Sequence, residues 1–407
     1  MAFDPAPFRD LFPALAMTVG GRPAAFFDGP GGSQVPEAVI AAHRDYYVAR
    51  NANTHGQFQT SRLADETVAA ARSAAAALLG AEGPTSISFG QNMTSLNFAL
   101  ARAVGRTLQR GDEIVVTDLD HDANVAPWLS LEERGVVVRS CPVHLDTCTL
   151  DMDALRAIIG ERTRHVAVGY ASNAVGTVND VGEIVRLAHA AGATVSIDAV
   201  HFAPHGLIDV QALDADFLLC SAYKFFGPHV GILYSRPGAL DHLPTDRVRP
   251  QDPAAPTRIE TGTLNHAALA GTTAAIETIA AQGDGVSLRE RIASAFAAIY
   301  PYEHGLAGRL WQGLRAIPGV TLYGPPVGDA LRAPTVSFRL AGSEPSSVAA
   351  RLGAQGFFVW DGDFYAVTLI KRLGLADQGG VVRVGMAPYI VDREVDGLLQ
   401  AVRAIAG

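Results

Sequence analysis

The sequence is short of basic residues and of long apolar runs, and each shortage excludes a class of protein. Its 407 residues contain 32 Lys and Arg against 41 Asp and Glu, which gives a formal net charge of −9. Binding to nucleic acids or anionic membrane surfaces requires basic patches on the protein, so neither is expected as a partner. No apolar run reaches the ~18 residues that a membrane span requires.

Cysteine is also scarce, occurring only as Cys141, Cys148 and Cys220. These spacings suit neither a disulfide framework nor a zinc site, and they fit a reducing compartment. The N-terminus, MAFDPAPFRDLFP, lacks the basic and apolar regions of a signal peptide. Hydrophobic residues make up 48% of the chain and charged residues 18%, as in ordinary globular proteins. We therefore expect a soluble, cytoplasmic enzyme.

The middle of the chain alternates apolar strand-like runs with alanine-rich helical stretches, a pattern typical of a mainly parallel sheet with helices on both faces. After residue 285 one long helical stretch, 288–314, leads into shorter strands and helices. We predict a three-layer α/β/α large domain over 20–285 and a small α+β domain over 286–407, with residues 1–19 packing against the small domain. The predicted strands of the large domain are 86–89, 113–117, 136–141, 165–170, 194–198, 217–220 and 231–234.

Lys224 is the most informative residue of the sequence. It follows the apolar run 217–220, and its apolar and aromatic neighbours make a charge costly, which lowers its pKa. Asp198 ends a neighbouring apolar strand. Pyridoxal phosphate needs such a pair, because the lysine forms an imine with it and the carboxylate keeps the pyridine nitrogen protonated. Either residue alone has a structural interpretation, but both together in one crevice favour the cofactor.

Other predicted strand ends also carry polar side chains. Residues 90–94, Gly-Gln-Asn-Met-Thr, open a helix whose free N–H groups suit a phosphate, although Asn92 alone explains a helix cap. Residues 120–124, Asp-His-Asp-Ala-Asn, could place a side chain over a cofactor ring or form an ordinary loop. Asn173 could reach a phenolate oxygen or serve a turn. Such strand ends meet in the crevice where open α/β sheets bind ligands.

A metal site is not expected. His201 and His205 have the i, i+4 spacing of a metal pair on a helix, but Pro204 and Gly206 interrupt that helix. Zinc catalysis also needs a third ligand in register.

The chain resembles the class V members of the fold type I pyridoxal-phosphate enzymes, close to the cysteine desulfurases and selenocysteine lyases. The resemblance runs nearly end to end, and its most specific part is the ordered set Asp198, His201, Ser221, Lys224 and Gly262-Thr263. It implies that Lys224 is the Schiff-base lysine and Asp198 the pyridinium partner, and that His201 hydrogen-bonds the phenolate oxygen.

The resemblance also implies roles at the two ends of the ligand. The phosphate would be held by Asn92, Met93 and Ser221, joined by Thr263 from the second subunit of a homodimer with shared active sites. Asn173 and Arg383 match positions that hold the substrate carboxylate, a task for which a bidentate guanidinium is suited.

The chain departs from this family at three places. Desulfurases carry a mobile cysteine that takes the sulfur as a persulfide, but the corresponding segment 357–366 reads FFVWDGDFYA. The histidine that stacks on the ring in many relatives corresponds to Asp122, and Tyr223 replaces the histidine before the lysine.

The sequence therefore predicts a pyridoxal-phosphate enzyme for a small, sulfur-containing amino acid, acting by β-elimination as a C–S lyase. Lys224 would be the general base, assisted by Tyr223 or Asp122. Aminotransfer and epimerisation are alternatives within the same family, and a cofactor-binding protein without catalysis is a further one.

Overall fold

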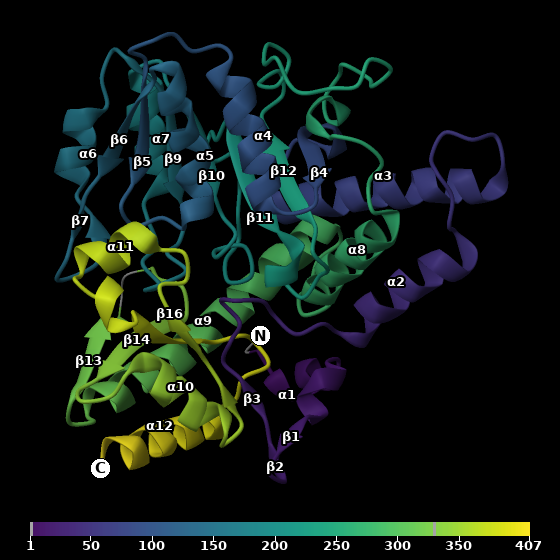
Figure 1. Cartoon of the computed structure of the whole chain (residues 1–407). Helices are drawn as coiled ribbons and strands as arrows, with labels where there is room; N and C mark the ends of the chain where they lie inside the picture. Colours follow the sequence, from purple (N-terminus) through teal and green to yellow (C-terminus); the bar gives the residue numbers. More distant parts are fainter. Residues whose placement is uncertain (1–2, 329–330) are drawn as a thin grey trace.

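The large part of the molecule is organised around a seven-stranded sheet. The computed structural model describes residues 3–328 and 331–407 (Figure 1). The sheet order is β4-β12-β11-β10-β9-β5-β6. Only β12 is antiparallel to its neighbours, while the pairs from β11 to β6 are parallel. The strands are β4 (Ile87–Gly90), β5 (Glu113–Thr117), β6 (Val137–Cys141), β9 (Thr163–Gly169), β10 (Thr194–Asp198), β11 (Phe217–Ser221) and β12 (Gly231–Ser235).

The central strands form because they are short, nearly continuous apolar runs that lose water on both faces. All five residues of β5, of β11 and of β12 are buried, as expected of strands covered by helices on both sides. The mainly parallel α/β fold predicted from the sequence is confirmed. The helices of this part are α2 (Glu37–Ala49), α3 (Gln59–Leu79), α4 (Met93–Gly105), α5 (Ala126–Leu129), α6 (Met152–Ile158), α7 (Val181–Ala190) and α8 (His266–Ala280).

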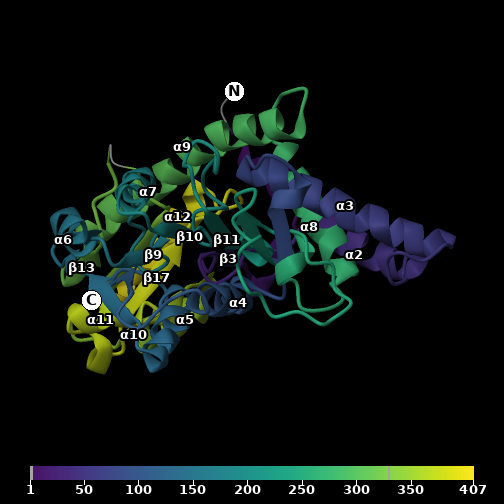
Figure 2. The same cartoon turned by 90° about the horizontal axis from the view of Figure 1, so that it is seen from above.

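Helices α2, α3 and α8 pack together at one end of the sheet, and α2 and α3 project away from it (Figure 2). Helix α7 shows the usual reason for such packing, since its buried residues Val181, Ile184, Val185 and Ala188 recur at helical spacing. A short hairpin of β7 (Val143–His144) and β8 (Thr149–Leu150) follows β6. In the described parts of the chain no helix has the length and apolarity needed to cross a bilayer.

The smaller part is an α+β unit entered through α9 (Leu288–Arg315), a single helix of 28 residues that contains Pro301. Its antiparallel sheet has the order β13-β14-β17-β16. The strands are β13 (Val320–Tyr323), β14 (Thr335–Leu340), β16 (Trp360–Gly362) and β17 (Val381–Gly385), and the helices are α10 (Pro345–Gly353), α11 (Val367–Arg372) and α12 (Asp392–Ala406).

The N-terminal segment lies on the small part. Arg9, at the end of α1 (Pro5–Arg9), pairs with Glu394 of α12 at 2.8 Å. Beyond the small hairpin of β1 (Thr18–Val19) and β2 (Arg22–Pro23), strand β3 (Ala25–Phe26) pairs with β15 (Phe357–Phe358). Asp28 then forms a bridge with Gly385. The domain boundary predicted at residue 20 therefore falls inside a segment that contacts the small part as far as Asp28.

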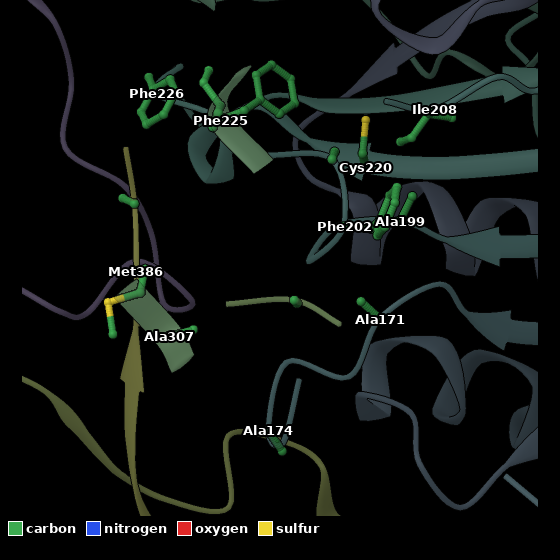
Figure 3. Close-up of a cluster of buried hydrophobic side chains, with 14 of the residues drawn as sticks. Ala171, Ala174, Ala199, Phe202, Ile208, Cys220, Phe225, Phe226, Ala307 and Met386 are labelled. Atoms are coloured by element: carbon green, nitrogen blue, oxygen red, sulfur yellow. The ribbon is translucent and has the colours of Figure 1, made fainter. Parts of the chain in front are cut away.

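One apolar cluster runs through both parts and fixes their relation. The Phe226 ring, two residues after Lys224, packs edge-on against Phe8 and Phe12, and Phe12 packs against Tyr389. Figure 3 shows the same cluster near the sheet, where Cys220 lies close to Ala199 and Ile208. The lysine loop is thus anchored in a core to which the N-terminal segment and the small domain both contribute.

Candidate active site

A cavity lies at the carboxyl ends of the parallel strands. It is formed where open α/β sheets bind ligands, because the polar residues that follow successive strands converge there. Its lining comprises Asn92, Met93, Thr94, Asp120, His121, Ala123, Gly169, Ala171, Asn173, Asp198, Val200, His201, Ser221, Tyr223 and Lys224.

One end of the cavity is the N-terminus of α4. Asn92 caps this helix by accepting a hydrogen bond from Ser95 N at 2.8 Å, and the Met93 N–H donates to Ser221 Oγ at 3.0 Å. A Cβ on Gly231 would lie 2.4 Å from the Asn92 carbonyl carbon, so only glycine permits this close approach. Helix α4 has 13 residues, and the Ser221 hydroxyl lies beside its N-terminus. This arrangement suits an anion such as a phosphate.

Lys224 follows β11 in a short 3-10 turn, and its amine donates to the Pro30 carbonyl. Burial and, to a smaller extent, the charge of Arg383 lower the pKa of this amine to about 7, against a smaller opposing effect of Asp198. An amine with this pKa is about half unprotonated at neutral pH. It is therefore available as a nucleophile or a base without any further activation.

Asp198 is the last residue of β10 and is buried. Its Oδ1 accepts the Val200 N–H at 2.9 Å, which orients the carboxylate. Burial raises its pKa to about 6, while the Val200 hydrogen bond and the charge of Lys224 lower it. The group remains mostly ionised at neutral pH and can hold a positively charged ring nitrogen in the cavity.

His201 lines the cavity from the turn after β10, and its Nε2 is 3.0 Å from Thr335 Oγ1 of β14. Its neighbour His205 has its ring centroid 5.6 Å away, and His205 Nδ1 lies 2.9 Å from Glu303 Oε2. Among the residues that the structure describes, no cluster of three His, Cys, Asp or Glu could hold a metal.

His121 is the residue of the 120–124 motif that faces the cavity together with Asp120, and the assignment to Asp122 requires correction. His121 is fixed by a hydrogen bond from Ala123 N to its Nδ1, and its ring stacks on Tyr365 with centroids 5.2 Å apart. Of the described residues, Asp122 is not among those that line the cavity. Its N–H donates to Tyr365 O at 2.7 Å.

The sequence pattern did not indicate which side chain of the motif faces the cavity, because the direction of each side chain depends on the 3-10 turn 122–124. Burial lowers the pKa of His121 to about 4, with Lys224 and Arg383 adding to the effect, so the ring is neutral. Asp120, which the sequence analysis also did not select, accepts hydrogen bonds from Gly169 N and Asn124. Burial raises the pKa of Asp120 to about 7.

Asn173 lines the cavity and contacts Arg383, which is not among the described lining residues; we call the region around these two residues the mouth. Arg383 donates to the Asn173 carbonyl at 3.1 Å, and Asn173 Nδ2 donates to Phe364 O at 2.9 Å. Burial lowers the pKa of Arg383 to about 9, and the nearby carboxylate of Asp28 opposes this shift. In the described chain three buried polar atoms here have no partner, namely Asp28 Oδ1, Asn173 Oδ1 and Arg383 Nε.

Two residues of the segment 357–366, Phe364 and Tyr365, lie against residues of the site. The Phe364 ring lies 3.9 Å from the Arg383 guanidinium carbon, and Tyr365 covers His121. Phe364 and Tyr365 both have left-handed backbone angles, φ 55° and 58°, which are unfavourable for aromatic residues. In the described chain neither Arg383 nor Phe364 is among the residues that line the cavity, and the Phe364 ring covers the Arg383 guanidinium.

Tyr223 belongs to the lining of this cavity, whereas Thr263 lies outside it. Tyr223 lines the cavity, its ring centroid is 4.8 Å from the Lys224 amine, and its ring stacks on that of His229 with centroids 4.7 Å apart. Thr263 is exposed and lines a separate open groove, which meets the cavity only at Asn92.

All three cysteines are buried and lie outside the cavity lining of the described chain. Burial raises the pKa of the Cys141 thiol to about 12 and also raises those of Cys148 and Cys220. Thiolate chemistry at these positions is therefore suppressed.

Comparison with known proteins decides the family. The sequence model of the aminotransferase class-V family matches residues 25–398. The chain belongs to this family. It is 34% identical to a probable cysteine desulfurase of Synechocystis sp. over 98% of the chain and 95% of that protein. It is 32% identical to the cysteine desulfurase of Dickeya dadantii over 98% of the chain and 95% of the relative.

Another relative of this class V enzyme is a probable cysteine desulfurase of Mycolicibacterium paratuberculosis, 36% identical over 99% of the chain. The chain spans only 58% of that longer protein. Among solved structures, a cysteine desulfurase from Thermococcus onnurineus superimposes with a TM-score of 0.87 at 29% identity, covering 100% of this chain and 99% of the other. One from Escherichia coli has a TM-score of 0.85 at 28% identity, covering 99% and 98%.

Proposed function

We propose that this class V enzyme uses pyridoxal phosphate to cleave the C–S bond of a small, sulfur-containing amino acid. The observation that carries the proposal is the meeting of Lys224 and Asp198 in one cavity, each with a pKa shifted by burial. Perturbed titratable groups in a cleft are typical of catalytic sites. The names of the relatives, cysteine desulfurases, support the substrate class.

The residues present fit pyridoxal phosphate. Its phosphate matches the N-terminus of α4, where Asn92, Met93 and Ser221 would hold it. The Asp198 carboxylate would hold its ring nitrogen, and His121, on the wall of the same cavity, would contact its ring. His201 would face the phenolate oxygen. When bound, the cofactor supplies the electron sink that allows bonds at the α-carbon of an amino acid to break.

The protein's own groups would then bind the substrate and move protons. Lys224, with its pKa near 7, is the general base that takes the proton from the substrate α-carbon. His121 is neutral and lies on the cavity wall, so it replaces Asp122 as the candidate for assistance, next to Tyr223. Arg383 and Asn173 would receive the substrate carboxylate, which offers acceptors to the unpartnered Arg383 Nε.

Sulfur would leave as sulfide rather than pass to a thiol of the chain. The three cysteines are buried with raised pKa values, and the segment 357–366 contains none. With cysteine as substrate, the net reaction is cysteine and water giving pyruvate, ammonia and hydrogen sulfide. The aromatic side chains of this segment can shape a pocket but cannot carry a persulfide.

The assay is a panel of amino acids given to the protein loaded with pyridoxal phosphate, with sulfide, pyruvate and ammonia followed together. Equal release of all three products from a sulfur-containing amino acid is the expected result. Release of sulfide with alanine and without ammonia would contradict elimination. Transfer of the amino group to a keto acid would identify the protein as an aminotransferase. Racemisation of the amino acid in deuterated water would identify it as an epimerase.

We also propose that the active enzyme is a homodimer in which Thr263 serves the phosphate of the partner's site. Its exposure, and its place in a groove outside the Lys224 cavity, support this role. Subunits with Lys224→Ala and with Thr263→Ala should regain activity when they exchange into mixed dimers, because each mixed dimer then contains one intact site. A fully active monomer on sizing with light scattering would refute the shared site.

A further inference from the structure

Two side chains of the small domain hold the histidine pair His201 and His205. Thr335 Oγ1 of β14 lies 3.0 Å from His201 Nε2, and Glu303 Oε2 of α9 lies 2.9 Å from His205 Nδ1. The His205 ring packs against that of His201 at 5.6 Å with an angle of 73° between the rings. All four residues are buried, so none of these polar atoms has water as a ready substitute partner.

His201 is a neutral imidazole. Burial lowers its pKa well below the ordinary value, and the charges of His205, Lys224 and Arg383 lower it further. A neutral ring has one N–H donor and one bare acceptor nitrogen, and the partner of one nitrogen decides which is which. The bond between His201 Nε2 and Thr335 Oγ1 can therefore be formed in two ways, with either atom as the donor.

The surroundings of Thr335 favour one of them. Within the part of the chain that the structure describes, Oγ1 of Thr335 has no hydrogen-bond partner other than His201. If Nε2 donated to this oxygen, the hydroxyl hydrogen would remain buried without an acceptor. That cost lowers the population of this tautomer by about tenfold or more. If the hydroxyl donates to Nε2, both groups are satisfied by a single bond, and the ring proton resides on Nδ1.

We propose that Thr335 is a positioning residue that sets the tautomer of His201, so that Nδ1–H is the donor presented to the cavity. A neutral N–H donor stabilises an anionic oxygen without protonating it. Because Thr335 belongs to the small domain and His201 to the large one, this donor is available only when the two domains are packed as described. Glu303 acts alongside it by fixing the His205 ring that confines His201.

The tautomer is a property of the protein alone, and only the identity of the anionic oxygen, the phenolate of pyridoxal phosphate, rests on the proposed function. The first measurement uses cofactor-free protein labelled with ¹⁵N-histidine, in which long-range ¹H–¹⁵N spectra show which ring nitrogen carries the proton. The His201 signals are assigned by their loss in His201→Gln. We expect the Nδ1–H tautomer in the wild type and in Thr335→Ser, which keeps the hydroxyl.

Thr335→Val removes the hydroxyl while retaining the shape of the side chain, and it should populate the Nε2–H tautomer. The matched control is Ser337→Ala on the same strand, where a buried hydroxyl bound to the Ala174 carbonyl is lost and the His201 tautomer should not change. An Nε2–H tautomer in the wild type overturns the proposal, and so does an unchanged tautomer in a folded Thr335→Val protein. If that variant does not fold, the wild-type and Thr335→Ser spectra still decide.

The second measurement is the dissociation constant of pyridoxal phosphate by absorbance titration. Thr335→Val should raise it about tenfold, the effect of one misplaced hydrogen bond to a charged group, and Thr335→Ser should leave it within about twofold. Equal affinity in both variants would refute the link between tautomer and cofactor. If the tautomer changes as expected while no variant binds the cofactor, the proposed function fails and the tautomer assignment stands.

Discussion

The inner wall of the cavity and its mouth differ in how completely their polar groups are satisfied. At the inner wall, Asp198 accepts the Val200 N–H and the Met93 N–H donates to Ser221, so strand and helix ends are held by hydrogen bonds. At the mouth, Asn173 and Arg383 each retain a buried polar atom without a partner. The covering residues Phe364 and Tyr365 have left-handed backbones.

This difference indicates two tasks. A wall whose side chains are already oriented loses little freedom when a ligand binds, as a permanently held cofactor requires. A mouth with unsatisfied polar atoms and an unfavourable backbone gains when a carboxylate enters and the covering loop relaxes. Under the proposed function, the inner wall would hold the cofactor and the mouth would receive a substrate that comes and goes.

The largest effect should come from the inner wall, with Lys224→Ala. Loss of the base alone should lower kcat by about 10²–10⁴-fold, and the visible absorption band that borohydride abolishes should disappear. The chain has only one other lysine, the exposed Lys371. Lys371→Ala is therefore a matched control, and it should keep both the kcat and the visible absorption band of the wild type. Labelling of a peptide other than that of Lys224 would show that the assignment is wrong.

Asp198→Asn should follow, with kcat lowered by roughly 10²–10³-fold, as when one preorganised electrostatic group is removed. The amide fills the same space but cannot stabilise a charged ring nitrogen. Cofactor affinity should change much less than kcat, and steady-state kinetics with a separate binding titration measure the two. An unchanged kcat would rule out the role of this carboxylate.

The pH dependence connects the two regions through Arg383. Burial and the Arg383 charge lower the pKa of Lys224 to about 7, so only above that pH is most of the amine neutral and nucleophilic. The rate at which cofactor-free protein takes up pyridoxal phosphate should therefore rise with pH through about 7. Arg383→Met should raise the pKa of Lys224 and move this rise to higher pH. An unchanged pH profile of cofactor uptake in Arg383→Met would show that the Arg383 charge does not influence the pKa of Lys224.

Phe364→Ala tests whether the mouth must open. The ring lies over the buried Arg383 guanidinium, and an interaction of this type is worth ~0.5–1 kcal/mol at exposed sites and ~2 kcal/mol when desolvated. Its removal should lower the inhibition constant of a simple carboxylate such as propionate by roughly five- to thirtyfold. Tyr365→Ala, which uncovers His121 instead, is the control and should change it less. Weaker inhibition in Phe364→Ala would mean that the ring contacts the ligand rather than covering its site.

The smallest effect should be that of the cysteines. The triple variant Cys141→Ser, Cys148→Ser, Cys220→Ala should retain most activity, because none of these thiols lies at the wall or the mouth as described. Thermal unfolding should reveal a loss of about 1 kcal/mol at position 220, similar to that of one deleted methyl group in a core. A persulfide trapped on any of the three during turnover, with activity lost on its removal, would contradict sulfide release.

The sequence by itself determined the parts whose structure follows from local pattern. The apolar runs of β5 and β10 have the predicted bounds 113–117 and 194–198, because a buried strand is encoded by consecutive apolar residues. Lys224 and Asp198 could be located for the same reason, since each follows such a run directly. Helix α2 was not predicted, because its two buried residues, Val39 and Tyr46, give a weak apolar stripe.

Only the tertiary structure decided which side chains face the cavity where the backbone turns. His121 rather than Asp122 lines it, because the 3-10 turn after β5 rotates each successive side chain to a different direction. The cover of Arg383 by Phe364, and the bond between Thr335 and His201, join residues 19 and 134 positions apart in the sequence. The bond between His201 and Thr335 depends on how the C-terminal part packs against the large sheet, whereas the contact between Phe364 and Arg383 depends on the loop that follows β16 within that part. No local sequence pattern encodes either contact.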